Sequence, residues 1–108
     1  MRDLRWSKRA WSEWHALQDY IASDNPAAAE RVGADILRAL ELPRRFPESG
    51  RPGRVEGTRE IVITGTPYLA AYEVHDDVTY VVTVQHGAQE WPSRFPKEDS
   101  RKPPRKAN

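Results

Sequence analysis

The stretch that decides the fold runs from Thr58 to His86 and reads TREIVITGTPYLAAYEVHDDVTYVVTVQH. It contains three β-rich runs, residues 58–64, 68–75 and 78–86, separated by the short turns GTP and DD. Connections of two or three residues join antiparallel neighbours, so the stretch predicts a three-stranded meander. Strict alternation along the last run predicts one shared face for Val78, Tyr80, Val82, Val84 and His86.

Two amphipathic helices are predicted before this meander. Ser7 is a suitable N-cap for a helix that continues to about Ser23. Asn25 followed by Pro26 predicts the start of a second helix, and Pro43 is expected to end it. Only two or three residues join the helices, so we expect an antiparallel hairpin.

A short first strand over residues 3–6 completes the predicted order β-α-α-β-β-β. The fold class is α+β, with the helical hairpin packed on one face of a twisted, mainly antiparallel sheet. Residues 43–57 are predicted to be a loop, because three prolines and three glycines fall within them.

The charge is distributed unevenly along the 108 residues. Residues 1–92 contain 11 Lys or Arg and 14 Asp or Glu, whereas residues 93–108 contain six and two. We expect one domain over residues 1–92 and a basic, disordered tail over residues 93–108. A mildly acidic body is not the surface of a protein that holds a long phosphate backbone, because such binding depends on neutralising phosphates.

Several classes of site are disfavoured by composition and spacing. The chain has no cysteine, and its three histidines, His15, His75 and His86, show no metal-ligand spacing. No apolar run approaches the roughly 20 residues of a membrane span. We therefore expect a cytoplasmic protein with no membrane segment, metal or cofactor.

Basic and aromatic side chains are the candidates for partner contacts. Arg51, Arg54 and Arg59 belong to the basic cluster of the 44–59 region, which could bind an acidic or phosphate-bearing partner or remain solvated. Trp11 and Trp14 are expected to pack between helix and sheet, or to form a partner surface.

Trp91 and His86 lie near the end of the predicted domain, and each has its own candidate role. Trp91, followed by Pro92, is predicted to fold back over the core as a lid. His86 ends the last strand, where it could act as a general acid or base, or could hydrogen-bond a neighbouring carbonyl.

Three segments resemble one family of proteins. DYIASDNPAAAERV (19–32), FPESGRPGRVEGTREIVITGTPYLAAYEV (46–74) and VTVQHGAQEWP (82–92) resemble the RelE/ParE superfamily of toxins from bacterial type II toxin–antitoxin modules. The resemblance covers about residues 3–92. It implies a growth-inhibiting toxin that a cognate antitoxin protein neutralises in a hetero-oligomer. The target would be either DNA gyrase, bound as a protein, or the ribosome, where mRNA is cut without metal.

Comparison with the RNA-cutting branch shows several departures. Glu60 and Val62 stand where that branch carries lysines, Leu69 and Gln89 where it carries arginines, and Phe95 near its tyrosine. A carboxylate repels phosphate, and a leucine cannot donate a hydrogen bond to it, so these departures disfavour a metal-independent endoribonuclease.

A rearranged nuclease site would have to use His86, Arg59 and Arg54. Arg59 starts one strand and His86 ends another that runs the same way, so we expect them at opposite ends of the sheet. The H-x-x-M-D ending common in gyrase-targeting members is also absent, and HGAQEW stands there instead.

The sequence favours a gyrase inhibitor that acts by protein binding. The alternatives are a ribosome-dependent mRNA endonuclease and an antitoxin-binding remnant without toxicity. For antitoxin or target contacts we expect the helical hairpin and the sheet edge near residues 44–60. The candidate contact residues are Arg51, Arg54, Arg59, Trp11, Trp14 and Trp91.

Overall fold

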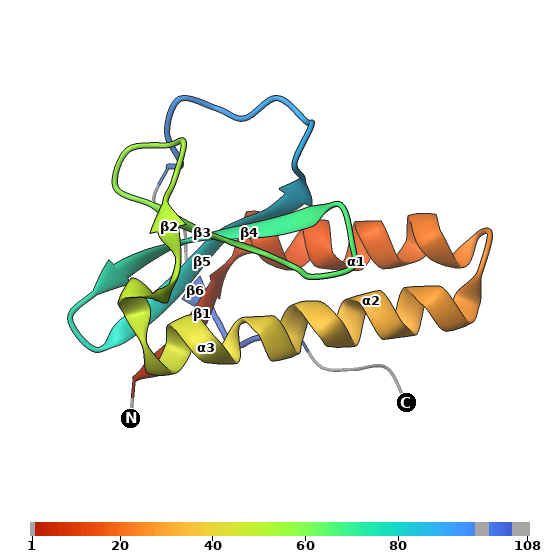
Figure 1. Ribbon diagram of the computed structural model, residues 1–108, viewed down its shortest axis with the longest axis horizontal. Helices are drawn as coiled ribbons and strands as arrows, with labels where there is room; N and C mark the ends of the chain where they lie inside the picture. Colours follow the sequence, from red (N-terminus) through yellow and green to blue (C-terminus); the bar gives the residue numbers. More distant parts are fainter. Residues whose placement is uncertain (1, 97–99, 105–108) are drawn as a thin grey trace.

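The computed structural model describes residues 2–96 and 100–104 (Figure 1). A helical hairpin covers one face of a mixed sheet with the strand order β2-β3-β4-β5-β1-β6, in which β1 and β5 are parallel. The predicted order β-α-α-β-β-β is confirmed, with short elements added to it. In chain order the elements are β1 (Asp3–Ser7), α1 (Lys8–Ala22), α2 (Pro26–Ala39), α3 (Glu41–Arg45), a 3-10 turn (Pro47–Ser49), β2 (Arg51–Pro52), β3 (Arg59–Val62), β4 (Tyr68–His75), β5 (Val78–His86) and β6 (Ser100–Arg101).

Both long helices begin at the predicted caps. The Ser7 hydroxyl oxygen accepts a hydrogen bond from the Ala10 amide at 2.9 Å, and Asn25 Oδ1 accepts one from the Ala28 amide at 3.1 Å. Pro26 occupies the first turn of α2, where a missing N–H costs nothing. Local sequence alone is therefore sufficient to place these two helix starts.

The end of the second helix differs from the prediction. Helix α2 ends at Ala39, and α3 begins at Glu41, so the break lies at Leu40 and the prediction that Pro43 ends the helix is wrong. Pro43 lies in the first turn of α3, where no intrahelical N–H is required. Its carbonyl accepts a hydrogen bond from Thr79 Oγ1 at 3.0 Å, which ties α3 to β5.

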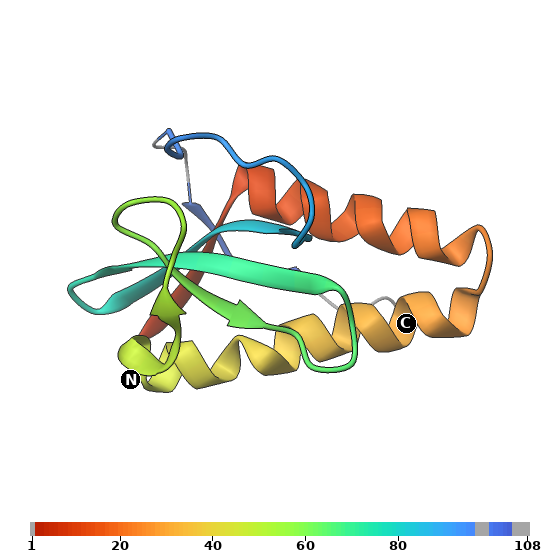
Figure 2. The same ribbon diagram turned by 45° about the horizontal axis from the view of Figure 1, so that its top comes forward.

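The hydrophobic core lies between the hairpin and the face of the sheet that the helices cover (Figure 2). Its largest side chains have almost no exposed surface, and they come from the sheet, from both long helices and from residues directly after these elements. The central members are Trp6, Trp14, Ile36, Leu40, Ile63, Val81 and Val84.

Strand β5 contains an irregularity that the alternation pattern could not reveal. Ala71 pairs with Thr83 while Tyr72 pairs with Val81, so Val82 is the extra residue of a β-bulge. Val81 and Val84 consequently both point into the core, although strict alternation assigns them to opposite faces. The prediction that one face holds all five even-numbered residues from Val78 to His86 is wrong.

Part of the segment expected to be a disordered tail has a defined place. Ser100 pairs with Ser7 and Arg101 with Trp6, which makes β6 an antiparallel neighbour of β1. Residues 97–99 and 105–108 lie outside the described residues, and the domain boundary at residue 92 stays a prediction. Within the described residues, every helix is too short or too polar to cross a bilayer.

Candidate functional site

Two of the three candidate arginines converge on one carboxylate. Glu60, on β3, is only 3% exposed. Its Oε1 accepts a hydrogen bond from Arg51 Nη2 at 3.2 Å, and its Oε2 accepts from the Arg54 backbone amide at 2.8 Å and from Arg54 Nε at 3.2 Å. This cluster joins β2, the following loop and β3.

These contacts keep the Glu60 carboxylate charged. Burial by itself raises the pKa of the carboxyl group, but the hydrogen bonds from Arg54 and Arg51, together with the positive charge of Arg54, outweigh burial and lower the pKa. A buried negative charge therefore lies at the position where the resemblance to RNA-cutting toxins would require a lysine.

Arg54 has contacts beyond this ion pair. Its Nη1 donates a hydrogen bond to the Gly87 carbonyl at 3.1 Å, and its Cζ lies 4.1 Å from the centroid of the Trp91 ring. Trp91 is partly buried, and its predicted role as a lid over the core stays a prediction. Arg54 thus connects β3 to the segment that follows β5.

Arg59 and His86 lie apart. Arg59 on β3 pairs with Tyr72 of β4, and His86 on β5 pairs with Tyr68 of the same strand. Arg59 and His86 are therefore two strands apart, and their positions along β4 differ by four residues, about 13 Å at the usual rise per residue. Arg59 Nη1 instead donates to the Gly50 carbonyl at 2.8 Å. The structure does not bring the three residues of the rearranged nuclease site, Arg54, Arg59 and His86, together around one point.

The His86 side chain is exposed, and His86 makes hydrogen bonds within the turn that follows β5. Its Nδ1 accepts a hydrogen bond from the Ala88 amide at 3.1 Å, and its backbone N–H donates to Gln89 Oε1 at 3.0 Å. The ring also lies edge-on to Tyr68, with centroids 6.0 Å apart. The ring of His86 thus hydrogen-bonds a backbone amide and not, as considered from the sequence, a neighbouring carbonyl, and these contacts fasten the turn after β5.

The two helical tryptophans have different environments. Trp14 is 1% exposed, and its indole N–H donates to the Gly33 carbonyl at 3.1 Å, so it packs in the core and leaves no surface for a partner. Trp11 is only partly buried, with its ring centroid 4.1 Å from that of His15 and 5.5 Å from Arg101 Cζ. Only Trp11 of this pair remains available for a contact.

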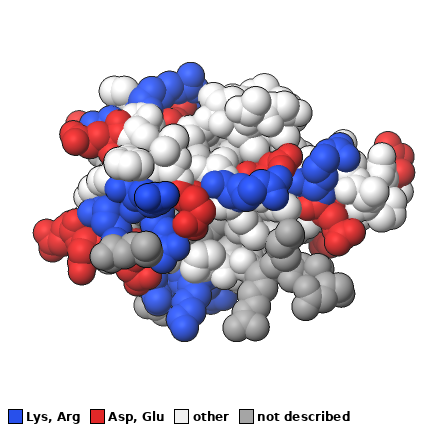
Figure 3. Space-filling model, turned by 60° about the horizontal axis from the view of Figure 1, so that its bottom comes forward, with Lys and Arg blue, Asp and Glu red and all other residues white. Residues whose placement is uncertain are grey.

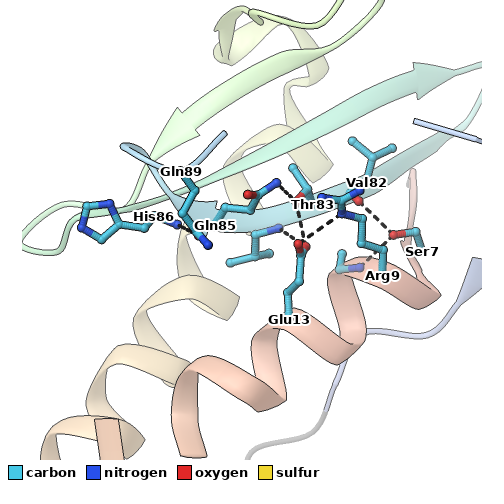
Figure 4. A network of polar contacts seen from close by, with 10 residues as sticks. Ser7, Arg9, Glu13, Val82, Thr83, Gln85, His86 and Gln89 are labelled. Carbon is cyan, nitrogen blue, oxygen red and sulfur yellow. Dashed lines mark hydrogen bonds and ion pairs between the residues drawn. The ribbon is translucent and has the colours of Figure 1, made fainter. Parts of the chain in front are cut away.

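A polar network along the edge of β5 was not indicated by the sequence (Figure 4). Strand β1 pairs with β5 only as far as Val81, and side chains complete the edge beyond that point. Glu13 Oε1 accepts from Thr83 Oγ1 at 2.7 Å and from the Val84 amide at 3.1 Å, and the Ser7 hydroxyl donates to the Val82 carbonyl at 3.0 Å. Glu13 and Thr83 are 70 residues apart in sequence, so no local pattern could have indicated their contact.

Two surface hollows flank the sheet. One, of about 430 Å³, lies between α1 and the ends of β4 and β5, where Tyr20, Tyr68 and His86 line it. The other, of about 450 Å³, lies between α2, α3 and the outer edge of β3, and includes Leu42 and Val62, which are both about half exposed. Among residues 2–96 and 100–104, no three His, Asp or Glu side chains gather as a metal-binding group.

Comparison with known proteins gives a consistent result. Residues 4–91 match the family model described as the ParE toxin of the type II toxin–antitoxin system parDE. The chain is 42% identical over 89 residues to the putative toxin Y4kP of Sinorhizobium fredii, an alignment that covers 82% of this chain and 92% of that protein. It is 32% identical to the toxin RelE2 of Caulobacter vibrioides over 89 residues, 82% of this chain and 99% of that protein.

A solved structure has the same fold. The chromosomal ParDE toxin–antitoxin system from P. aeruginosa contains a chain that matches with a TM-score of 0.71 and 22% identity, over 80% of this chain and 96% of that chain. On the strength of the family model and the sequence relatives, this chain belongs to the ParE toxin family of type II toxin–antitoxin systems.

Proposed function

We propose that this toxin stops growth by binding DNA gyrase as a protein ligand, without cutting RNA. Membership of a toxin–antitoxin family implies a cognate antitoxin that binds and neutralises the chain. The choice of target depends on the residues that an RNA-cutting toxin would need.

The proposal rests on the burial and the charge of Glu60. Its carboxylate is buried, charged and hydrogen-bonded by two arginines, on the face of the sheet that the helices leave uncovered. Phosphoryl transfer needs positive groups close to the developing negative charge, and a fixed carboxylate there opposes it. Leu69, on the same face, is also buried and has no group that could donate to phosphate.

The surface charge agrees with protein binding better than with RNA binding. On the face shown in Figure 3, the described Lys and Arg side chains are interspersed with Asp and Glu side chains instead of forming one broad basic surface. Binding that follows a phosphate backbone depends on many such positive contacts.

For the antitoxin, the hollow between α2, α3 and β3 is our preferred contact surface. It lies at the sheet edge near residues 44–60, where the sequence predicted partner contacts. Leu42 and Val62 offer apolar area there, and Arg38 and Arg51 lie beside them. A segment that folds on binding needs apolar surface of this kind to offset its loss of conformational freedom.

The experiment is to induce the chain without its antitoxin and to follow three quantities. We expect growth arrest, inhibition of supercoiling by purified gyrase in the presence of the purified toxin, and intact mRNA ends on translating ribosomes. A gene with an early stop codon controls for the burden of induction.

Two outcomes would contradict the proposal. Codon-phased mRNA cleavage, with gyrase unaffected, would identify the ribosome-dependent endonuclease instead. Unimpaired growth at a protein level that a tagged copy confirms would identify an antitoxin-binding remnant.

A further inference from the structure

The segment after β5, residues 87–96, is here called the strap. It leaves the end of β5, and the chain then returns to pair as β6 with β1 (Figures 1 and 2). The residues matched by the ParE family model end at residue 91, inside the strap. Residues 92–96 of the strap therefore lie outside the region that matches the family model.

A row of buried residues crosses the sheet on the face away from the helices. Glu60 pairs with Ala71 and Ala71 with Thr83, so the three side chains lie side by side on β3, β4 and β5. Each is at most 3% exposed. Their neighbours Ala70 and Val84 belong to the core under the helices, so something other than the helices must cover this row.

Two arginines connect the ends of this row to the strap. At the β3 end, Arg54 binds Glu60 and also the Gly87 carbonyl and the Trp91 ring of the strap. At the β5 end, Thr83 binds Glu13, whose other oxygen lies 3.2 Å from Arg9 Nε.

Arg9, the second of these arginines, contacts the strap at Phe95. Arg9 Cζ lies 5.2 Å from the centroid of the Phe95 ring in the strap. The Trp91 and Phe95 ring centroids are 6.3 Å apart and the rings are steeply inclined, so they contact each other edge to face. The strap's two aromatic rings are thus linked through Arg54 and Arg9 to opposite ends of the buried row.

We propose that the strap is a lid over this face of the sheet, that Arg54 is its latch, and that the lid opens while the helix-covered core stays folded. At its start the strap is held by the Gly87 N–H, which donates to the Pro67 carbonyl at 3.0 Å. Its contacts with Arg54 and Arg9 are cation–π contacts and one hydrogen bond, not a strand ladder. Opening therefore breaks few bonds and leaves the core cluster untouched.

An unsatisfied group in the closed lid favours opening. Trp91 Nε1 is buried and has no hydrogen-bond partner among the described residues. Water would satisfy this donor once the lid opened, because an indole N–H hydrogen-bonds readily when it is exposed. Access to Thr83 from solvent is then controlled by the strap.

The test uses the absence of cysteine from this chain. Thr83→Cys places a thiol under the lid, and Val81→Cys places one in the core on the other side of β5. The rate of reaction with N-ethylmaleimide is measured for each thiol in the full chain. We expect the thiol at position 83 to react faster than the thiol at position 81, because its exposure does not require the core to unfold.

Latch variants are then added to both reporters. Arg54→Ala removes the contacts with Trp91 and Gly87, and we expect it to speed the reaction at position 83 by about tenfold while the rate at position 81 changes by less than about twofold. Trp91→Ala keeps both arginines on Glu60 and should accelerate the reaction at position 83 as Arg54→Ala does.

The matched control is Arg51→Ala. Arg51 binds the same carboxylate as Arg54, but its side chain has no hydrogen bond, ion pair or ring contact with the described residues of the strap. We therefore expect Arg51→Ala to leave the reaction rate at position 83 unchanged.

Three outcomes would overturn the proposal. Equal acceleration at positions 83 and 81 would mean that the face opens only when the core unfolds. An unchanged rate at position 83 in both Arg54→Ala and Trp91→Ala would mean that the strap does not shield this face. Equal effects of Arg51→Ala and Arg54→Ala would assign the shielding to the charge balance at Glu60 and not to a latch. None of these readouts depends on the toxin's target.

Discussion

The two faces of the sheet are built in different ways. The helix-covered face is apolar, and its residues come from the periodic patterns of α1 and α2 and from strand residues that include Val81 and Val84 on either side of the bulge. The other face carries Glu60 and Thr83, whose polar groups are satisfied by Arg51, Arg54 and Glu13. Apolar packing tolerates many sequences, whereas buried polar groups need specific partners, so the second face is the more sensitive to the identity of single residues.

The largest effect is expected from the apolar face. Trp14→Ala removes a fully buried indole and its hydrogen bond to Gly33, and we expect the free energy of unfolding in urea to fall by about 3–5 kcal/mol. Trp11→Ala is the control on the same helix, and its loss should be well below half as large because Trp11 is only partly buried. Equal losses of unfolding free energy in the two variants would show that Trp11 and Trp14 contribute equally to stability, although only Trp14 is fully buried.

The second face is tested by Glu60→Gln. At neutral pH we expect a loss of about 1–3 kcal/mol in the free energy of unfolding, because a buried charge-assisted cluster loses its anion while both arginines keep access to solvent. A variant as stable as the wild type would show that the two ion pairs only offset the cost of burying the carboxylate.

The same variant should change the pH dependence of stability. The pKa of Glu60 is lower in the folded chain than its ordinary value of 4.5, so the unfolded chain binds more protons as the solution is acidified. The stabilisation is complete above about pH 4.5 and is lost as the pH falls through the folded pKa. Urea titrations between neutral and acidic pH should show this loss in the wild type and a flatter profile in Glu60→Gln; parallel profiles would contradict it.

A smaller effect is expected where the helical hairpin meets the edge of β5. Ser7→Ala removes both the cap of α1 and the hydrogen bond to the Val82 carbonyl, and should cost about 1–2 kcal/mol in thermal or urea unfolding. Asn25→Ala removes a cap alone, so it should cost less, about 1 kcal/mol. A Ser7 variant no worse than the Asn25 variant would show that the Val82 bond contributes nothing measurable.

The smallest effect is expected at His86. His86→Ala changes an exposed residue, so the free energy of unfolding should change by less than about 0.5 kcal/mol. On the proposed function, growth inhibition should also persist. A folded His86→Ala protein that has lost toxicity would instead support nuclease chemistry at the end of β5.

Much of the fold was predictable because it follows from local patterns. The caps at Ser7 and Asn25 and the short turns of the meander each depend on a few neighbouring residues. The bulge at Val82 was not predictable, since its cause is the pairing of β5 with β4 and not a property of either strand alone.

The candidate site was predictable only as a set of residue types. The sequence indicated arginines at 51, 54 and 59 and a lid tryptophan at 91, but not that Arg54 would bind Glu60, Gly87 and Trp91 together. Arg54 and Gly87 are 33 residues apart, and the length of a loop does not determine where its side chains will meet.

By itself, the sequence determined the helical hairpin, the antiparallel meander and the family, because periodicity, capping and short turns act over a few residues. Only the tertiary structure decided which charges are buried, which edge of β5 is completed by Glu13, and where the strap lies. Those features depend on contacts between residues far apart in the chain, and such contacts exist only once the sheet has assembled.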